Sequence, residues 1–299
     1  MEASPELFAS LDTGVRICYQ TFGDPSDPAT VFIPGHSGSM LEWRDELLPY
    51  FSPPHDKRYL IRFDQRDTGL STEFPVPGDY DLADMVKDVE GLVDHLELPK
   101  RGFHLVGVSL GGAIAYMFAS RRSDQLRSLT LMYTSPGASA EIPLNEAFQA
   151  IDLRMGQDRA TFIHNGNALF NAYATQPLDE EEQKENAAHV ERVTDRDMKG
   201  GTLYSKSMNH GAAAFADRPG IDCLKDIKCP TTVIQAAKDQ VFGVAHGEAL
   251  AAGIVGAQYV LWDDVGHEVP KRVWGRLARV LLDTWQRGDR EWKGTTEST

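Results

Sequence analysis

The chain has 299 residues, of which 41% are hydrophobic and 25% charged, a balance that is usual for a globular protein with a large core. The 44 Asp and Glu residues outnumber the 30 Lys and Arg residues, which leaves a formal net charge of −14. This excess of negative charge argues against nucleic acid or an anionic membrane as a partner, and it is compatible with a small neutral or cationic substrate.

The first elements form a short strand-rich region. Two antiparallel strands are expected over 7–11 and 15–19, and a buried strand follows at 30–33. The small-residue loop 34–38 comes directly after that buried strand, at a place where backbone N–H groups often face a ligand. Apolar side chains then recur at helical spacing over 40–50, which predicts a helix there.

Strands and helices alternate in the next part of the chain. The strands are expected at 59–63, 105–108 and 126–132, with an amphipathic helix at 81–97 and another helix directly after Ser109. Such alternation implies parallel strands joined by right-handed crossovers. The sequence therefore predicts an α/β fold with a mostly parallel central sheet flanked by helices.

Residues 137–222 interrupt this alternation. They are polar and helix-like, and they include the acidic run 179–185. We expect them to form an inserted helical lid, with a second independent domain as the alternative. The alternation then resumes, with strands at 231–235 and 257–262 and helices at 245–252 and 269–286. Residues 1–136 and 223–290 are accordingly expected to form the core, and 291–299 a disordered tail.

A G-x-S-x-G sequence, Gly107-Val-Ser109-Leu-Gly111, lies at a predicted strand-to-helix junction. Such a sharp turn holds its central serine in strained backbone geometry above the edge of the sheet. Glycine on either side lets strand and helix approach closely. The free N–H groups of the helix, beginning with Leu110, would face a developing oxyanion. The alternative is a glycine-rich turn with an exposed serine that has no catalytic role.

A serine nucleophile needs a base and an acid that orients the base. Both are expected in loops at the carboxyl ends of the strands, where a parallel sheet forms its crevice. His267 follows the last strand and Asp239 follows the strand before it, which gives the chain order Ser, Asp, His. Other candidates fit less well: His104 at the amino end of its strand, Asp263 and Asp264 as turn formers, and His164, His189 and His210 as solvated lid residues.

These motifs resemble the alpha/beta-hydrolase family over nearly the whole chain outside the lid. The loop Asp64–Ser71 is similar to the family's loop after the fourth strand, with Arg66 and Asp67 as expected scaffolding. The Arg-Asp-Thr-Gly run and the segment Val265–Pro270 most resemble the aclacinomycin methylesterase group, which hydrolyses a methyl ester on a polyketide-derived aromatic. The family often has His-Gly before its oxyanion residue, whereas this chain has Pro34-Gly35. The resemblance implies that the backbone N–H groups of His36 and Leu110 form the oxyanion hole.

The resulting hypothesis is a serine hydrolase that cleaves an ester of a hydrophobic small molecule through an acyl-enzyme. The same three residues could instead serve a C–C bond (β-diketone) hydrolase or a lactone hydrolase. A small-molecule receptor with little turnover is the alternative outside enzymes. The three cysteines (Cys18, Cys223 and Cys229) form no C-x-x-C, so neither a disulfide framework nor a thiolate zinc site is expected. The serine mechanism itself implies no metal or organic cofactor. The absence of a signal-like or spanning apolar run predicts a cytoplasmic protein.

Overall fold

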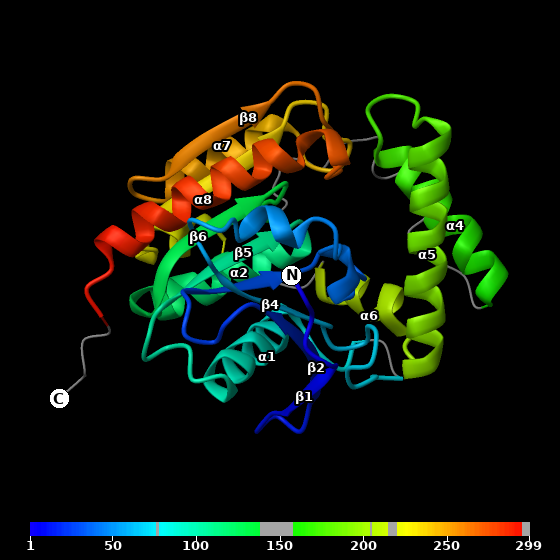
Figure 1. Cartoon of the computed structure of the whole chain (residues 1–299), viewed down its shortest axis with the longest axis horizontal. Helices are drawn as coiled ribbons and strands as arrows, with labels where there is room; N and C mark the ends of the chain where they lie inside the picture. The colour runs from blue at the N-terminus through cyan, green and yellow to red at the C-terminus, as the bar shows by residue number, and fades with distance from the viewer. Residues whose placement is uncertain (76–77, 138–157, 204, 215–219, 295–299) are drawn as a thin grey trace.

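The computed structural model describes residues 1–75, 78–137, 158–203, 205–214 and 220–294. Its centre is an eight-stranded sheet in the order β1-β2-β4-β3-β5-β6-β7-β8 (Figure 1). Strands β3 to β8 pair in parallel, and β1 and β2 are added in antiparallel fashion beside β4. The predicted mostly parallel α/β fold is therefore confirmed. The strands are β1 (Leu7–Ser10), β2 (Arg16–Phe22), β3 (Ala29–Ile33), β4 (Tyr59–Phe63), β5 (Phe103–Val108), β6 (Leu126–Met132), β7 (Thr231–Ala236) and β8 (Gln258–Trp262).

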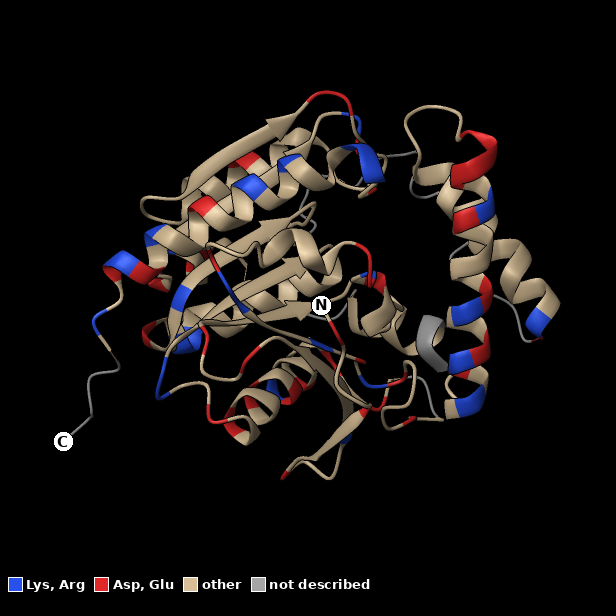
Figure 2. Cartoon of the chain, viewed as in Figure 1, with Lys and Arg blue, Asp and Glu red and all other residues tan. Residues whose placement is uncertain are grey.

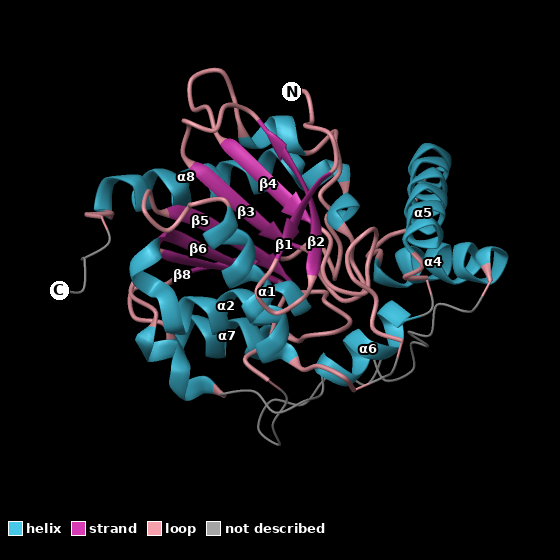
Figure 3. Ribbon diagram, turned by 90° about the horizontal axis from the view of Figure 1, so that it is seen from below, coloured by secondary structure: helices cyan, strands magenta, loops and turns pink. Residues whose placement is uncertain are grey.

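Helices cover both faces of this sheet (Figure 3). Side chains of α1 (Leu82–His95), α2 (Leu110–Arg122) and α7 (Val244–Gly253) share one buried cluster with Val31 and Ile33 of β3. Side chains of α8 (Trp274–Glu291) share the opposite cluster with Phe32, the residue between them. Successive side chains of a strand point to opposite faces, so one strand supplies both cores. All residues of β3, β4, β5 and β7 are buried, as expected for strands covered on both sides.

Three helices of the predicted lid stand beside the carboxyl edge of the sheet (Figure 1). They are α4 (Arg159–Tyr173), α5 (Glu180–Gly200) and α6 (Ser205–Ala214). Helix α5 begins with a capping box in which the side chains of Asp179 and Glu182 each accept the other residue's backbone N–H. Acidic residues gather in its first turn, and residues of both signs follow along its length (Figure 2). Residues 138–157, 204 and 215–219 of the predicted lid lie outside the described residues, as do residues 295–299 of the predicted tail.

Two predicted helices differ from the structure. Residues 40–50 form two 3-10 turns, η1 (Met40–Glu42) and η2 (Leu48–Phe51), instead of one helix. Pro49 contributes to this break, because proline lacks the N–H that a helix interior needs. The last helix begins at Trp274 instead of 269, after Pro270 and the turn η5 (Lys271–Val273). Short 3-10 helices also lie at η3 (Ser123–Gln125) and η4 (Ile221–Asp226). None of the described helices combines the length and the apolar character that crossing a lipid bilayer requires.

Candidate active site

Ser109 occupies the sharp turn between β5 and α2, with backbone angles φ 53° and ψ −119°. A positive φ is costly for a residue that has a Cβ, so the surrounding structure must hold this conformation. The flanking glycines make the turn possible. A Cβ at Gly107 would lie 2.2 Å from the carbonyl oxygen of Gly111, and a Cβ at Gly111 would lie 2.3 Å from that of Pro34. The backbone of Ser109 is fixed on both sides, since its N–H donates to Met132 O at 2.9 Å and its carbonyl accepts from Thr134 Oγ1 at 2.6 Å.

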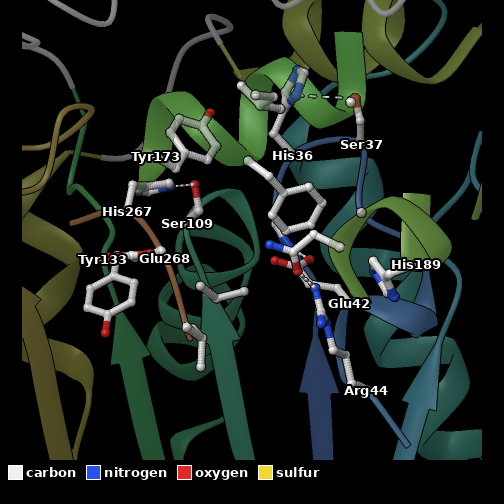
Figure 4. A pocket seen from close by; sticks show the side chains of 18 of the residues that line it. His36, Ser37, Glu42, Arg44, Ser109, Tyr133, Tyr173, His189, His267 and Glu268 are labelled. Atoms are coloured by element: carbon white, nitrogen blue, oxygen red, sulfur yellow. Dashed lines mark hydrogen bonds between the residues drawn. The ribbon is translucent and has the colours of Figure 1, made fainter. Parts of the chain in front are cut away.

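The structure brings Ser109, His267 and Asp239 together in one line of hydrogen bonds (Figure 4). His267 Nε2 lies 3.0 Å from Ser109 Oγ, and His267 Nδ1 lies 2.9 Å from Asp239 Oδ2. The other carboxylate oxygen of Asp239 accepts the N–H groups of Val241 at 2.7 Å and Phe242 at 2.9 Å. Because a carboxylate only accepts, Nδ1 carries the ring proton and Nε2 presents its lone pair to the serine. This is the arrangement that general-base activation of a hydroxyl requires.

Aromatic side chains enclose the imidazole of His267. Its ring centroid lies 5.1 Å from that of Tyr173, 5.8 Å from that of Phe242 and 6.2 Å from that of Tyr133. The side chain of His267 is only 9% exposed, and that of Asp239 is fully buried. Excluding water around these two groups strengthens the interaction between a histidinium and a carboxylate. The hydrogen bond between His267 and Asp239 therefore lies in a largely enclosed part of the site.

The two residues predicted to form an oxyanion hole lie beside the turn of Ser109. Leu110 is the first residue of α2, where the N–H groups have no partner within the helix. His36 belongs to the loop Pro34–Gly38, which follows β3 and which we call the oxyanion loop. This loop packs against the turn, since a Cβ at Gly35 would lie 3.4 Å from Ser109 Cβ. The side chain of His36 is directed along the loop, where its Nδ1 lies 3.1 Å from Ser37 Oγ (Figure 4).

Glu42 is a functional candidate that the sequence reasoning missed. Its Oε2 accepts the N–H of Gly35 at 2.6 Å, so the carboxylate lies against the oxyanion loop. Glu42 lines the cavity above Ser109 and is exposed to it. Burial raises the pKa of Glu42 to about 7, against the opposing effects of the Gly35 hydrogen bond and the charge of His267. In the sequence, Glu42 lies between Leu41 and Trp43 and shortly before Arg44-Asp45-Glu46, a pattern that does not indicate this contact.

A cavity of about 370 Å³ opens above Ser109. The core supplies one wall, including Trp43 and Phe242, and the lid supplies the other, including Phe162, Phe170 and Tyr173. A hydrogen bond of 2.6 Å from Arg44 Nη2 of the core to Asn186 Oδ1 of the lid joins the two walls. Figure 4 shows where Arg44 lies. A mostly apolar cavity of this size that has a few polar groups at one end is typical of a site for a small hydrophobic ligand.

The remaining acidic and basic candidates occupy other places. Asp264 accepts a hydrogen bond from Arg276 at 2.8 Å and is half exposed, so it does not orient His267. His104 lies at the amino end of β5, where it contacts Ser128 Oγ at 2.9 Å. Burial lowers the pKa of His104 to about 4, and its contact with Asp289 opposes this effect only in part.

Two of the three lid histidines differ from the expectation that they are solvated. His210 is completely buried, and its Nδ1 and Nε2 contact Ser37 N at 3.0 Å and Arg66 O at 2.8 Å. His189 lines the cavity, and its pKa is lowered to about 3 by burial and by the nearby charges of Arg44 and Arg192. Residues distant in the sequence contact the buried ring of His210, and His189 faces the cavity, so the local sequence did not indicate either environment.

The loop after β4 is a buried scaffold, as its sequence suggested. Arg66 donates two hydrogen bonds to the carboxylate of Asp88, at 2.6 and 2.8 Å. Asp67 has a left-handed φ of 62° and accepts hydrogen bonds from Tyr80 Oη at 2.7 Å and from Asn209 Nδ2 at 2.8 Å. These contacts fix the loop to α1 and to the lid helix α6, away from Ser109.

Comparison with known proteins agrees with this fold. A family model described as the alpha/beta hydrolase fold matches residues 28–270. The 3-oxoadipate enol-lactonase 2 of Acinetobacter baylyi is 28% identical over 244 residues, which are 81% of this chain and 82% of that protein. The rhodomycin D methylesterase DauP of Streptomyces sp. (strain C5) is 24% identical over 298 residues, covering 89% of this chain and 94% of that protein. Among solved structures, the esterase RhEst1 of Rhodococcus sp. ECU1013 shares the fold with a TM-score of 0.76 at 18% identity, over 95% of this chain and 99% of that one.

Proposed function

The chain belongs to the alpha/beta hydrolase family, and from this premise we propose that it is a serine hydrolase that cleaves an ester of a hydrophobic small molecule. One observation carries the proposal: the continuous hydrogen bonding from Asp239 through His267 to Ser109 at the floor of a largely apolar cavity. Folding does not require an arrangement in which a partly buried serine faces an imidazole nitrogen. It is what nucleophilic attack on a carbonyl needs.

The proposed reaction has two halves. In the first, Ser109 Oγ attacks the ester carbonyl while His267 Nε2 accepts its proton, and Asp239 stabilises the histidinium. The N–H groups of His36 and Leu110 bind the oxyanion of the tetrahedral intermediate. The intermediate collapses, the alcohol leaves with the proton from His267, and an acyl-enzyme remains. In the second half, His267 activates a water molecule that releases the acid and restores Ser109. These steps use side chains and backbone N–H groups of this chain together with water.

The substrate class follows from the cavity and from the relatives. The largely apolar walls favour a hydrophobic body, with the scissile carbonyl at the polar floor beside Ser109. A methylesterase among the relatives supports a methyl or other carboxylic ester, including one on a polyketide-derived aromatic. The enol-lactonase among the relatives favours a lactone as the second candidate, because the same attack opens a cyclic ester and leaves the alcohol attached to the acyl group.

The test is active-site labelling together with hydrolysis of p-nitrophenyl acetate and butyrate. A fluorophosphonate probe should modify the purified chain at Ser109, as located by peptide mass spectrometry. The variant Ser109→Ala should lose labelling and lower kcat by several orders of magnitude; in subtilisin, loss of the serine lowers kcat roughly 10⁶-fold.

Ser120→Ala provides the matched control, because Ser120 lies on the same helix and its hydroxyl donates to Met117 O at 2.9 Å. It should keep wild-type labelling and turnover. Labelling at a residue other than Ser109, or more than about a tenth of wild-type activity in Ser109→Ala, would reject the proposal. A chain that binds aromatic esters without hydrolysing them would instead support the receptor alternative. A panel of methyl esters, lactones and β-diketones separates the hydrolase alternatives.

A further inference from the structure

The oxyanion loop is held by a residue of the lid. The backbone N–H of Ser37 donates to His210 Nδ1 at 3.0 Å, although 173 positions separate the two residues in the chain. His210 belongs to α6 and has no exposed surface. The contact therefore crosses from the lid to the residue that follows His36, and it does so in an environment from which water is excluded.

The two ring contacts of His210 require one protonation state. The carbonyl oxygen of Arg66 lies 2.8 Å from Nε2 and can only accept, so Nε2 carries the proton. The Ser37 N–H can only donate, so Nδ1 must present a lone pair to it. The neutral tautomer with the proton on Nε2 satisfies both contacts at once. His210 thus connects two backbone groups on different loops of the core.

The Arg66 side of the His210 contacts is held firmly by the core. The side chain of Arg66 is held by Asp88 through two hydrogen bonds, which fixes the residue whose carbonyl His210 contacts. Asn209, the neighbour of His210, donates to Asp67 Oδ2 at 2.8 Å and to Phe74 O at 2.6 Å. Helix α6 is therefore anchored to the loop after β4 on the same side as His210. The position of Nδ1 relative to the sheet is set by these contacts.

The oxyanion loop needs such support. Ser37 has a φ of 57°, which is unfavourable for a residue that has a Cβ. The loop is bound on both sides of His36, since Glu42 accepts the N–H of Gly35 and His210 accepts the N–H of Ser37. The rings of His36 and His210 also meet edge to face, with centroids 6.0 Å apart. These two contacts hold the peptide groups on either side of the one that carries the N–H of His36. Holding both restrains the direction of that N–H.

We propose that His210 is a positioning residue, whose Nδ1 lone pair aims the N–H of His36 at the oxyanion by holding Ser37. The inference rests on the proposed function, because it takes His36 as an oxyanion donor. It also couples the lid to catalysis: the oxyanion loop has its reactive geometry only while α6 is docked on the core. A displacement of about 1 Å in a catalytic group is enough to lower a rate about 100-fold.

Two substitutions test the Nδ1 and Nε2 contacts of His210 separately. In His210→Asn, the amide oxygen lies near the place of Nδ1 and can still accept the Ser37 N–H. In His210→Gln, the longer amide reaches toward Arg66 O and leaves the Ser37 N–H without an acceptor. We expect kcat for a p-nitrophenyl ester to fall about 10- to 100-fold in His210→Gln, with KM little changed, and to fall much less in His210→Asn. Inactivation by diethyl p-nitrophenyl phosphate, whose phosphoryl oxygen occupies the oxyanion hole, should slow in the same order.

His104→Asn is the control for loss of a buried histidine at a distance, since His104 lies at the amino end of β5 beside Ser128. Its kcat should match wild type at a temperature well below its Tm. Equal losses of kcat in His210→Asn and His210→Gln, or losses that follow the fall in Tm across all three variants, would overturn the proposal. Wild-type kcat in His210→Gln would overturn it as well.

These outcomes are distinct from failure of the proposed function. If the wild-type chain hydrolyses no ester and Ser109 takes no phosphonate label, the hydrolase proposal fails. If the wild-type chain is active and labelled while His210→Gln is equally active, the hydrolase proposal stands and the role of His210 fails alone.

Discussion

His267 Nε2 lies 3.0 Å from Ser109 Oγ, although 158 positions and the whole lid separate the two residues in the sequence. The sheet order explains the approach. Ser109 follows β5 and His267 follows β8, and both strands end at the same edge because β5, β6, β7 and β8 run parallel. Asp239 follows β7, which lies beside β8, so the carboxylate reaches the imidazole from the neighbouring strand end. The core strands therefore bring Ser109, Asp239 and His267 together without a contribution from the lid.

Replacing Asp239 by Asn should lower kcat by about 10³- to 10⁴-fold with a small effect on KM, as the same change does in a serine protease. The amide cannot stabilise a histidinium, and its NH₂ group would favour the tautomer with the proton on Nε2. The amide oxygen can still accept the N–H groups of Val241 and Phe242, so the fold should persist. Steady-state hydrolysis of a p-nitrophenyl ester measures the effect.

Asp264→Asn is the control for Asp239→Asn, because Asp264 lies three residues before His267 but pairs with Arg276 on the surface. It should retain full activity. A comparable loss in both variants would assign the effect to the loop instead of the carboxylate at Asp239.

Glu42 should make the stability of the chain depend on pH between its ordinary pKa of 4.5 and its raised pKa of about 7. In this window the folded state keeps a proton that the unfolded state has released, so the free energy of unfolding falls as pH rises. Glu42→Gln removes the titration while keeping an acceptor for Gly35. The Tm of Glu42→Gln relative to wild type should therefore be higher at pH 8 than at pH 4.5, as measured by thermal unfolding across that range.

Glu46→Gln gives the comparison for Glu42→Gln, since Glu46 lies four residues away and is not among the residues that line the cavity. Its Tm should follow wild type at each pH. A Tm difference between Glu42→Gln and wild type that stays constant with pH would contradict the assigned titration.

Gly111→Ala should destabilise the chain by about 1–3 kcal/mol, because the new Cβ would lie 2.3 Å from Pro34 O, a backbone atom that cannot move aside alone. The shift would also disturb the oxyanion loop that begins at Pro34, so activity should fall with stability. Gly275→Ala should act in the opposite direction. Gly275 lies in α8, nothing stands within 4 Å of an added Cβ, and alanine gains up to about 1 kcal/mol over glycine in a helix. Urea unfolding of the two variants provides the measurement, and equal effects would refute the steric argument.

Arg196→Met should lower the free energy of unfolding by about 3–5 kcal/mol. Arg196 on α5 pairs with Asp64 at 2.7 Å, and the carboxylate of Asp64 is fully buried, so the substitution leaves a charge without its cation. Arg159→Met should have a much smaller effect than Arg196→Met, because the pair of Arg159 with Asp195 is half exposed and screened by water. Chemical denaturation of both variants tests the contrast. Similar losses would show that burial does not set the strength of these lid contacts.

Much of the fold could be predicted because its signals are local. The apolar runs of β3 and β5 mark strands buried on both faces, and the periodicity of 81–97 marks a helix that the structure places at Leu82–His95. Gly107 and Gly111 predict a sharp turn at Ser109, and the structure has that turn. Asp239 and His267 were chosen by their place at strand ends, which the alternation of elements indicates without a structure.

The rest depends on contacts between distant segments, which periodicity does not encode. The 40–50 stretch has helical spacing, but it forms two short turns instead of one helix. Asp64 accepts the N–H of Met40 and Glu42 accepts the N–H of Gly35, and both contacts are with residues outside this stretch. His210 was expected to be solvated because it lies in the predicted lid, whose sequence is polar overall. Its buried environment is supplied by loops more than 140 positions earlier.

The left-handed backbone of Ser109 has an evolutionary consequence. A positive φ at a residue with a side chain costs about 1–3 kcal/mol, and glycine avoids this cost. Ser109→Gly should therefore melt at a higher temperature than the natural chain while losing its hydroxyl. Thermal tolerance alone would favour glycine here, so the proposed catalytic use of the hydroxyl offers a reason for a serine at this position.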